Sequence, residues 1–254
     1  MTAHRDGHWL RHAPRPLPAP IRAVIVATLP DWPRLDVAER ARLEEIAADL
    51  LHRPSWEPAR GFALDDQIRG TIVGHAALLG IGLPPPVFRN VTAIVVHPAT
   101  MALTGPRPGP MPGTVTDEPR PVLGHTSAHG PVFIAWDVAR EQARHPERGY
   151  DVVFHEFAHK LDAEDGTVDG TPLLPDRAAA RRWVAVCEAE YRDLRAGSGS
   201  PLLRDYAATT PGEFFAVVTE VFFDRGALLR EDRPALYRIL RDYYGQDPAD
   251  RRPA

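Results

Sequence analysis

The stretch F-H-E-F-A-H-K-L-D at residues 154–162 places two histidines, a glutamate and an aspartate inside an apolar segment. It directly follows Val152 and Val153, two residues that are typical of a protein core. Burial of ionisable side chains in such surroundings is costly unless a ligand or a partner replaces the lost hydration. The segment therefore indicates a functional site that is built into the core.

A helix over 151–163 would bring these polar side chains together. Each helical residue turns by about 100°, so His155, His159 and Asp162 share one face, and Glu156 lies beside it. Two imidazoles one turn apart can bind one zinc ion, and the H-E-x-x-H pattern places the glutamate next to a zinc-bound water. The sequence therefore predicts one zinc ion per chain on this helix.

Two histidines leave such an ion in need of a third protein ligand. Asp162 lies on the correct face but about 10 Å along the helix axis from His155. We therefore expect Asp162 to accept a hydrogen bond from a histidine N–H instead. The segment 211–220 offers Glu213 and Glu220, which are seven residues apart and so share one helix face. Helix geometry alone does not choose between these two glutamates.

Other residues that commonly bind metals are expected to have different roles. His97, His125 and His129 lie outside the helix, and we expect them on the surface or in loops. Cys187 is the only cysteine, so the chain can form neither an intrachain disulfide nor a thiolate cluster. The apolar neighbours at 183–186 predict a structural thiol, and a single cysteine fits a reducing, cytoplasmic compartment.

The composition is that of a folded, water-soluble protein. The chain has 254 residues, of which 44% are hydrophobic and 25% are charged, and its formal net charge is −4. This length suits one large domain or two small ones, and the charge argues against direct binding of nucleic acid. The sequence has no evident secretory signal, and the apolar stretch 21–29 is too short to span a bilayer. We therefore expect no membrane association.

The first part of the chain begins with a proline-rich segment. Residues 1–35 contain six prolines between positions 14 and 33, which predict an extended or loosely packed leader. A helix is expected over 38–52, opened by Asp36 and Glu39 as a capping box. A second helix is expected over 66–79.

The remaining pattern indicates an α+β domain over residues 36–250. Strands are expected at 87–97 and 132–136, separated by a long loop at 98–121 that is rich in proline and glycine. Further helices are expected at 151–163, 176–195, 211–224 and 232–244. Strands followed by helices favour an α+β fold, with a helical and strand part at 36–148 and a catalytic helical part at 149–250.

Two motifs together give the chain a resemblance to the Mlc titration factor A family of zinc metallopeptidases. They are H-E-F-A-H-K-L-D at 155–162 and Y-A-A-T-T-P-G-E-F-F-A-V-V-T-E-V-F-F at 206–223. The match covers roughly residues 20–250 and includes the segments 122–125, 130–137 and 243–248. The two motifs are also similar to the catalytic helices of anthrax lethal factor. The resemblance implies a zincin fold, with a small sheet, the H-E-x-x-H helix and a third ligand on a later helix.

The resemblance also implies roles for individual residues. In both relatives the third ligand is the glutamate seven residues after a tyrosine, which corresponds to Glu213 after Tyr206. Glu220 is then expected behind the ligands or at the edge of the core. The phenol of Tyr206 is expected to face the oxyanion of the tetrahedral intermediate. The departures, Gly212 where the family often has alanine and Phe214 where a cysteine can occur, affect none of these roles.

The predicted function is a zinc-dependent peptidase. His155, His159 and Glu213 would hold the ion and leave a fourth position for water. Glu156 would take the proton of this water during attack on the peptide carbonyl, and the metal and Tyr206 would stabilise the oxyanion.

Two alternatives use the same residues differently. The resemblance implies a binding protein that sequesters a transcriptional repressor, Mlc in some members, with peptidase activity secondary. A purely structural zinc site is disfavoured, because two histidines and one carboxylate leave an open position and Glu156 would have no purpose.

For the peptidase, the strand at 130–136 is expected to pair with an extended peptide or protein substrate.

Overall fold

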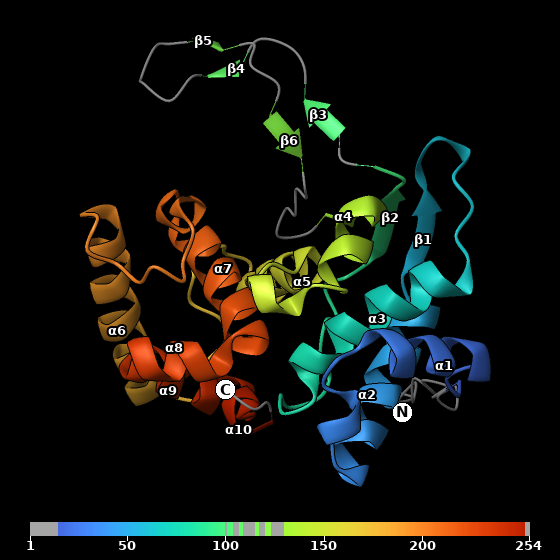
Figure 1. Cartoon of the computed structure of the whole chain (residues 1–254), viewed down its shortest axis with the longest axis horizontal. Coiled ribbons are helices and arrows are strands. Elements are labelled where there is room, and N and C mark those ends of the chain that lie inside the picture. Colours follow the sequence, from blue (N-terminus) through green and yellow to red (C-terminus); the bar gives the residue numbers. More distant parts are fainter. Residues whose placement is uncertain are drawn as a thin grey trace, which may run out of the picture.

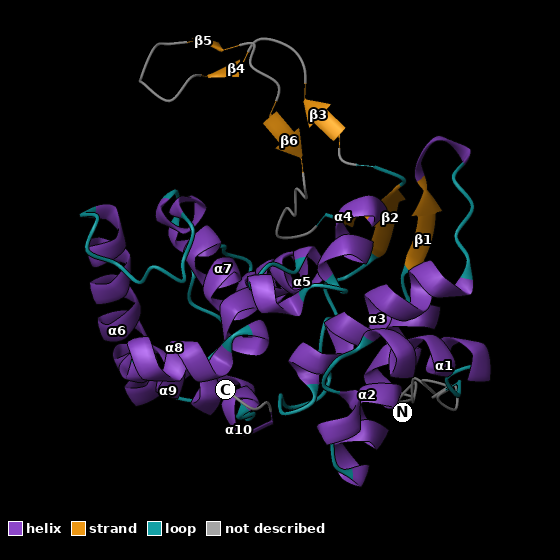
Figure 2. Cartoon of the chain, in the orientation of Figure 1, coloured by secondary structure: helices purple, strands orange, loops and turns teal. Residues whose placement is uncertain are grey.

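The computed structural model describes residues 15–99 and 130–251. Between them it describes the backbone of four short strands, at 101–103, 107–108, 115–116 and 120–122. The described chain is mostly helical and contains a small parallel sheet, as Figures 1 and 2 show. This architecture is consistent with the predicted α+β metallopeptidase. None of the described helices has the length and apolar character needed to cross a membrane.

The sheet contains three parallel strands, in the order β1 (Ser55–Pro58), β2 (Ala93–His97) and β7 (Val132–Ala135). Helix α3 (Asp66–Gly80) lies between β1 and β2 in the chain, which is the kind of crossover that parallel strands require. The predicted strand over 87–97 is shorter than expected, because Phe88 has a φ of 60°, outside the extended region. Among the described strands, β7 pairs only with β2 and so forms an edge of the sheet.

The segment predicted as one long loop over 98–121 contains short strands. β3 (Met101–Leu103) pairs with β6 (Arg120–Val122), and β4 (Arg107–Pro108) pairs with β5 (Val115–Thr116), both antiparallel. The rest of 100–119, together with His125 and His129, lies outside the described residues.

The helices agree well with the sequence pattern. They are α1 (Ala19–Thr28), α2 (Val37–His52), α3, α4 (Trp136–Gln142), α5 (Val152–Asp162), α6 (Arg177–Arg195), α7 (Pro211–Asp224), α8 (Gly226–Asp232), α9 (Pro234–Tyr244) and α10 (Pro248–Arg251). The capping box at α2 is confirmed: the Asp36 carboxylate accepts the Glu39 N–H at 2.8 Å, and the Asp36 N–H donates to the Glu39 carboxylate at 2.9 Å. Helices α8 and α10 were not predicted.

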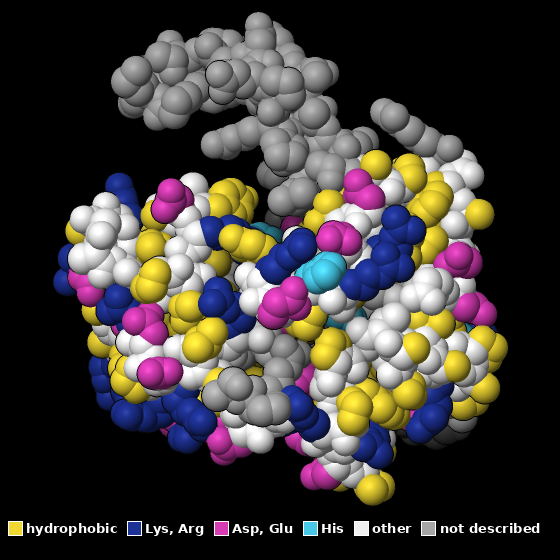
Figure 3. Space-filling model, viewed as in Figure 1, with side chains coloured by type: hydrophobic (Ala, Val, Ile, Leu, Met, Phe, Trp, Pro, Cys, Tyr) yellow, Lys and Arg dark blue, Asp and Glu magenta, His cyan; other side chains and the backbone are white. Residues whose placement is uncertain are grey.

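Helix α5 occupies the centre of the molecule. In Figure 1 it lies between the group α1–α3 and the group α6–α10. It packs against α3, α4, α7 and β7, and every one of its residues is buried. The buried apolar side chains form one cluster that extends from Ile21 in α1 to Ala249 in α10. Acidic and basic side chains are interspersed over the described part of the face in Figure 3.

The prediction of an extended or loosely packed leader is wrong for residues 19–28. These residues form α1, and Ile21 and Ile25 on this helix are buried. Pro18 occupies the N-cap and Pro20 lies in the first turn, where a missing N–H removes no helical hydrogen bond. The prolines therefore mark the start of a helix. Residues 1–14 of the leader lie outside the described residues.

Two glycines of α3 allow α1 to approach closely. A Cβ at Gly70 would lie 2.6 Å from the Cβ of Val24, and one at Gly74 would lie 3.0 Å from Cγ1 of Ile25. Contacts this short would force the two helices apart. Helix α1 is therefore an integral part of the core.

We predict that Ile25→Ala lowers the free energy of unfolding by about 2–5 kcal/mol, the usual cost of truncating a buried Ile. The adjacent Val26, which is 39% exposed, is the matched control, and Val26→Ala should change stability by less than about 0.5 kcal/mol. Urea denaturation measures both values. Equally small effects for the two variants would mean that α1 does not belong to the core.

Candidate metal centre

The metal centre is built on α5, whose start is held by Asp151. The carboxylate Oδ1 of Asp151 accepts the N–H groups of Val153 at 2.8 Å and Phe154 at 2.9 Å. These bonds satisfy donors that the first helical turn leaves free. Phe154 and other apolar side chains of α5 are packed in the core, which holds the polar face of the helix in a fixed orientation.

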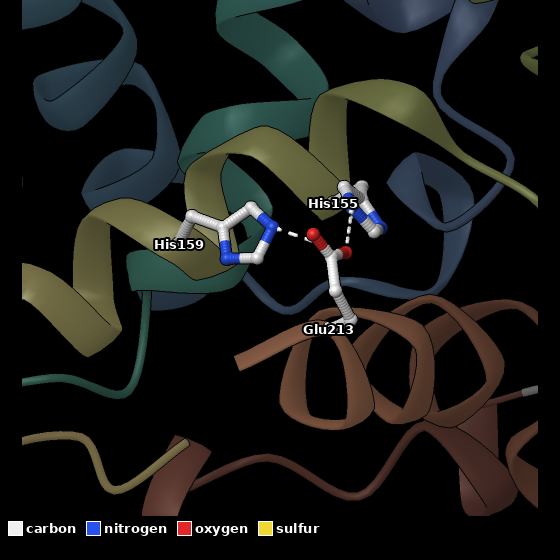
Figure 4. A group of neighbouring side chains, drawn as sticks. All are labelled: His155, His159 and Glu213. Carbon is white, nitrogen blue, oxygen red and sulfur yellow. Dashed lines mark ion pairs between the residues drawn. The ribbon is translucent and has the colours of Figure 1, made fainter. Parts of the chain in front are cut away.

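His155, His159 and Glu213 converge on one point, as Figure 4 shows. Oε2 of Glu213 lies 3.0 Å from Nε2 of His155 and 3.4 Å from Nε2 of His159. One potential ligand atom from each residue falls within 4.8 Å of the other two. Glu213 belongs to the first turn of α7, and α7 packs against α5. Helix geometry left Glu213 and Glu220 open and the family resemblance favoured Glu213; in the structure Glu213 lies on the Nε2 side of the histidines.

This set of donors fits a divalent metal such as zinc. Two imidazole nitrogens and one carboxylate oxygen are common zinc ligands, and they leave a fourth position of a tetrahedral site open. Oε2 of Glu213 is buried between the two nitrogens without a well-directed hydrogen bond to any residue in the described part of the chain. A buried carboxylate oxygen in this position needs a positive partner.

Glu220 lies behind His155, on the side away from Glu213. Nδ1 of His155 donates to Oε1 of Glu220 at 2.7 Å, and Glu220 is only 1% exposed. Arg204 donates to both oxygens of this carboxylate, at 2.6 and 3.0 Å. A proton fixed on Nδ1 leaves the lone pair of Nε2 for a metal, so Glu220 sets the tautomer that a ligand histidine needs.

The ionisation of the metal-free site reflects these contacts. Burial disfavours a charged imidazole, but the contacts with Glu213 and Glu220 prevail and raise the pKa of His155 to about 10. Burial likewise opposes charge on Glu213, yet its contacts with His155 and His159 lower the pKa of this carboxyl. Without a bound metal ion, these shifts favour a proton on His155 and a negative charge on Glu213.

Asp162 has a different partner from the one expected. It is fully buried, and its Oδ2 accepts the N–H of Gly170 at 2.9 Å. Within the described residues, neither its Oδ1 nor Nδ1 of His159 has a hydrogen-bond partner, so the expected bond from a histidine is not formed. Burial raises the pKa of Asp162 to about 6. Asp162 thus ties the loop that follows α5 to the end of that helix.

Tyr206 lies at the rim of the centre. Its ring centroid is 6.0 Å from that of His155, and 45% of the residue is exposed. Partial burial and the nearby carboxylate of Glu213 raise the pKa of Tyr206. The hydroxyl therefore keeps its proton at neutral pH and can donate a hydrogen bond.

Two further basic residues near the centre were not singled out in the sequence. Arg204 holds Glu220, and its guanidinium lies 5.0 Å from the ring of Tyr150 and 5.8 Å from that of Tyr206. Lys160 is fully buried and donates to the carbonyl of Gly130, just before β7. Burial lowers the pKa of Lys160 to about 8. The sequence signal for Lys160 was a lysine inside an apolar helix, whereas Arg204 gave none.

Two further candidates are not among the three converging side chains. Glu156 is 2% exposed on α5, beside His155 in the sequence. His97 lies at the end of β2 and does not belong to the group formed by His155, His159 and Glu213, the one such group among the described residues.

Known proteins include relatives that match nearly the whole chain. Residues 2–245 match the model of a family described as glucose-regulated metallo-peptidase M90. An uncharacterized protein of Synechocystis sp. is 32% identical over 254 residues, covering 95% of this chain and 90% of the relative. Mlc titration factor A of Serratia proteamaculans is 29% identical over 223 residues, covering 85% of this chain and 84% of the relative. Mlc titration factor A of Enterobacter sp. is 27% identical over 230 residues, covering 88% of this chain and 85% of the relative. The resemblance expected from the two motifs is confirmed, and the chain belongs to the glucose-regulated M90 family of metallopeptidases.

Proposed function

We propose that this protein is a zinc-dependent peptidase that binds one zinc ion per chain through His155, His159 and Glu213. The observation that carries the proposal is the convergence of these three side chains within 4.8 Å, from two helices that are far apart in the sequence. Membership of a metallopeptidase family supports it. The donor set, two imidazoles and one carboxylate with an open fourth position, is that of a catalytic zinc site.

A zinc ion bound here would supply a Lewis acid that acidifies water and polarises a peptide carbonyl. Glu156 acts as the general base: it accepts the proton of the attacking water and then passes it to the leaving amine. Its place beside His155 on the buried face of α5 supports this role. The hydroxyl of Tyr206 donates a hydrogen bond to the oxyanion as negative charge develops there.

The substrate is proposed to be a peptide or protein that lies along β7. This strand is an edge of the sheet within the described chain, so its outer N–H and C=O groups can pair with an extended peptide. The bond from Lys160 to Gly130 ties the start of β7 to α5. The start of the strand is therefore held at a fixed position next to the catalytic helix.

A second function is suggested by the name of the relatives from Serratia proteamaculans and Enterobacter sp., Mlc titration factor A. On that basis we propose, as the alternative, that the protein sequesters a transcriptional repressor of the Mlc type in the cytoplasm, without contacting nucleic acid itself. The two functions are separable, because sequestration does not require a general base. A Glu156→Gln protein that still captures the repressor but hydrolyses nothing would assign both.

Zinc affinity should rise with pH. Below its pKa of about 10, His155 of the metal-free protein is protonated, whereas a zinc ligand must be neutral, so binding releases a proton. Each unit of pH should then increase the affinity by up to about tenfold for each proton released. Competition with a chelator at pH 6.5, 7.5 and 8.5, corrected for protonation of the chelator, measures this. An affinity that does not change with pH would contradict a protonated His155.

The variant Glu156→Gln should keep zinc and fold but lose hydrolysis by about 100-fold or more. The amide has nearly the same shape but cannot accept a proton. Peptide-library cleavage and metal analysis on the same samples measure both properties. Glu147→Gln, on an exposed glutamate, is the control and should keep full activity. Normal turnover by zinc-loaded Glu156→Gln protein would rule out the proposed base.

We expect Tyr206→Phe to lower kcat by about 100-fold with little change in KM, because the hydroxyl acts only once the carbonyl oxygen carries charge. Tyr150→Phe is the matched control: Tyr150 is 41% exposed and also contacts Arg204, so it shares the surroundings of Tyr206. Steady-state kinetics and melting temperatures compare the two variants. Equal kcat values would remove Tyr206 from the mechanism, and loss of zinc from Tyr206→Phe would assign it a structural role.

A further inference from the structure

A buried ion pair connects the metal centre with the N-terminal helices. Nδ1 of His75, on α3, lies 2.5 Å from Oδ2 of Asp151, and the side chains are 4% and 5% exposed. The other ring nitrogen of His75 lies 3.3 Å from the carbonyl oxygen of Thr28. Both nitrogens thus face acceptors, which only the doubly protonated, positively charged ring can satisfy. Neither His75 nor Asp151 has a place among the ligands or catalytic residues proposed above.

The charge of this pair is consistent with its surroundings. Burial opposes protonation of His75, but Asp151 and the carbonyl of Thr28, with a smaller contribution from Asp31, raise the pKa of His75. The ring also contacts Phe154, one residue before the ligand His155, at a centroid distance of 5.5 Å. His75 therefore packs directly behind the first turn of α5.

Asp151 is linked to the ligand His155 by two routes. Its carbonyl accepts the N–H of His155 at 2.9 Å, in the first hydrogen bond of α5. Its own N–H donates to Oε2 of Glu220 at 3.0 Å, and Oε1 of Glu220 accepts the proton of His155 Nδ1 at 2.7 Å. A shift of Asp151 would therefore move both the backbone of His155 and the carboxylate that orients its ring.

Capping of α5 does not by itself require a histidine. Asp36 and Asp65 cap α2 and α3 through the same kind of bond, and the hydroxyl of Thr210 caps α7 without any charge. Asp151 differs from these caps in two further contacts. Its second carboxylate oxygen pairs with His75 of α3, and its N–H donates to Glu220 of α7. Three helices are thus fixed around a single residue.

We propose that the His75–Asp151 ion pair is a positioning element of the metal centre. By fixing Asp151, it fixes Glu220 and the start of α5, so that His155 presents Nε2 to the metal in one orientation. This inference rests on the proposed zinc site. Ligands held in place by such outer hydrogen bonds typically lose about 10- to 100-fold in metal affinity when the supporting residue is changed.

The test compares zinc affinity with stability in matched variants. The variant Asp151→Asn keeps a capping oxygen and the N–H to Glu220 but loses the ion pair. The double variant His75→Leu/Asp151→Asn removes both charges, so that no buried charge is left unpaired to prevent folding. The control is Ile72→Ala, a fully buried residue of α3 outside the polar contacts described above. For each protein we would measure the melting temperature without metal, the Kd for zinc by chelator competition, and the visible spectrum with Co²⁺ bound.

We expect both Asp151 variants to raise the Kd for zinc by about 10- to 100-fold and to change the Co²⁺ spectrum. Ile72→Ala should lower the melting temperature at least as much as the Asp151 variants do. Its Kd for zinc should nevertheless stay within about 3-fold of the wild-type value, with an unchanged Co²⁺ spectrum. If the folded double variant binds zinc as tightly as the wild type, or loses no more affinity than Ile72→Ala, the positioning role is refuted. Wild-type protein that binds no zinc would instead refute the proposed metal site itself.

Discussion

Glu213 reaches the two histidines only because the first turn of α7 packs across α5. The two helices are separated by some 50 residues of chain, and their contact combines buried apolar side chains with the polar contacts of His155 to Glu213 and Glu220. Gly212 in this turn leaves room for the loop that follows α5, because a Cβ there would lie 3.0 Å from Cγ1 of Val168. The helix contact, rather than any single ligand, therefore determines the geometry of the centre.

The buried charges around this contact alternate in sign, so that each group has an oppositely charged neighbour. Moving outward from the ligand atoms, His155 is followed by Glu220, and Glu220 by Arg204 and by the N–H of Asp151. Removing one member of a buried pair typically costs about 3–5 kcal/mol, because its partner keeps an uncompensated charge. The core can hold so many ionisable groups only as a connected set. The same connections restrict the direction in which each histidine can point.

The sequence predicted the local features well and the long-range contacts poorly. The helices predicted at 151–163 and 211–224 match α5 and α7, because apolar periodicity involves neighbouring residues only. The shared face of His155 and His159 follows in the same way. The bonds of Asp151 to His75 and of Glu220 to Arg204 join segments with no common pattern, so no single-sequence signal could reveal them. The error over residues 19–28 came from proline, which excludes a helix interior but favours a first turn.

We propose that His155, His159 and Glu213 bind one metal ion, and diffraction from zinc-loaded crystals tests this proposal directly. Data collected above and below the zinc absorption edge locate the ion without reference to the refined ligands. We expect one anomalous peak per chain, within about 2.0–2.2 Å of Nε2 of both histidines and of a Glu213 oxygen. No peak at this position, or a peak bound by Glu220 in place of Glu213, would contradict it.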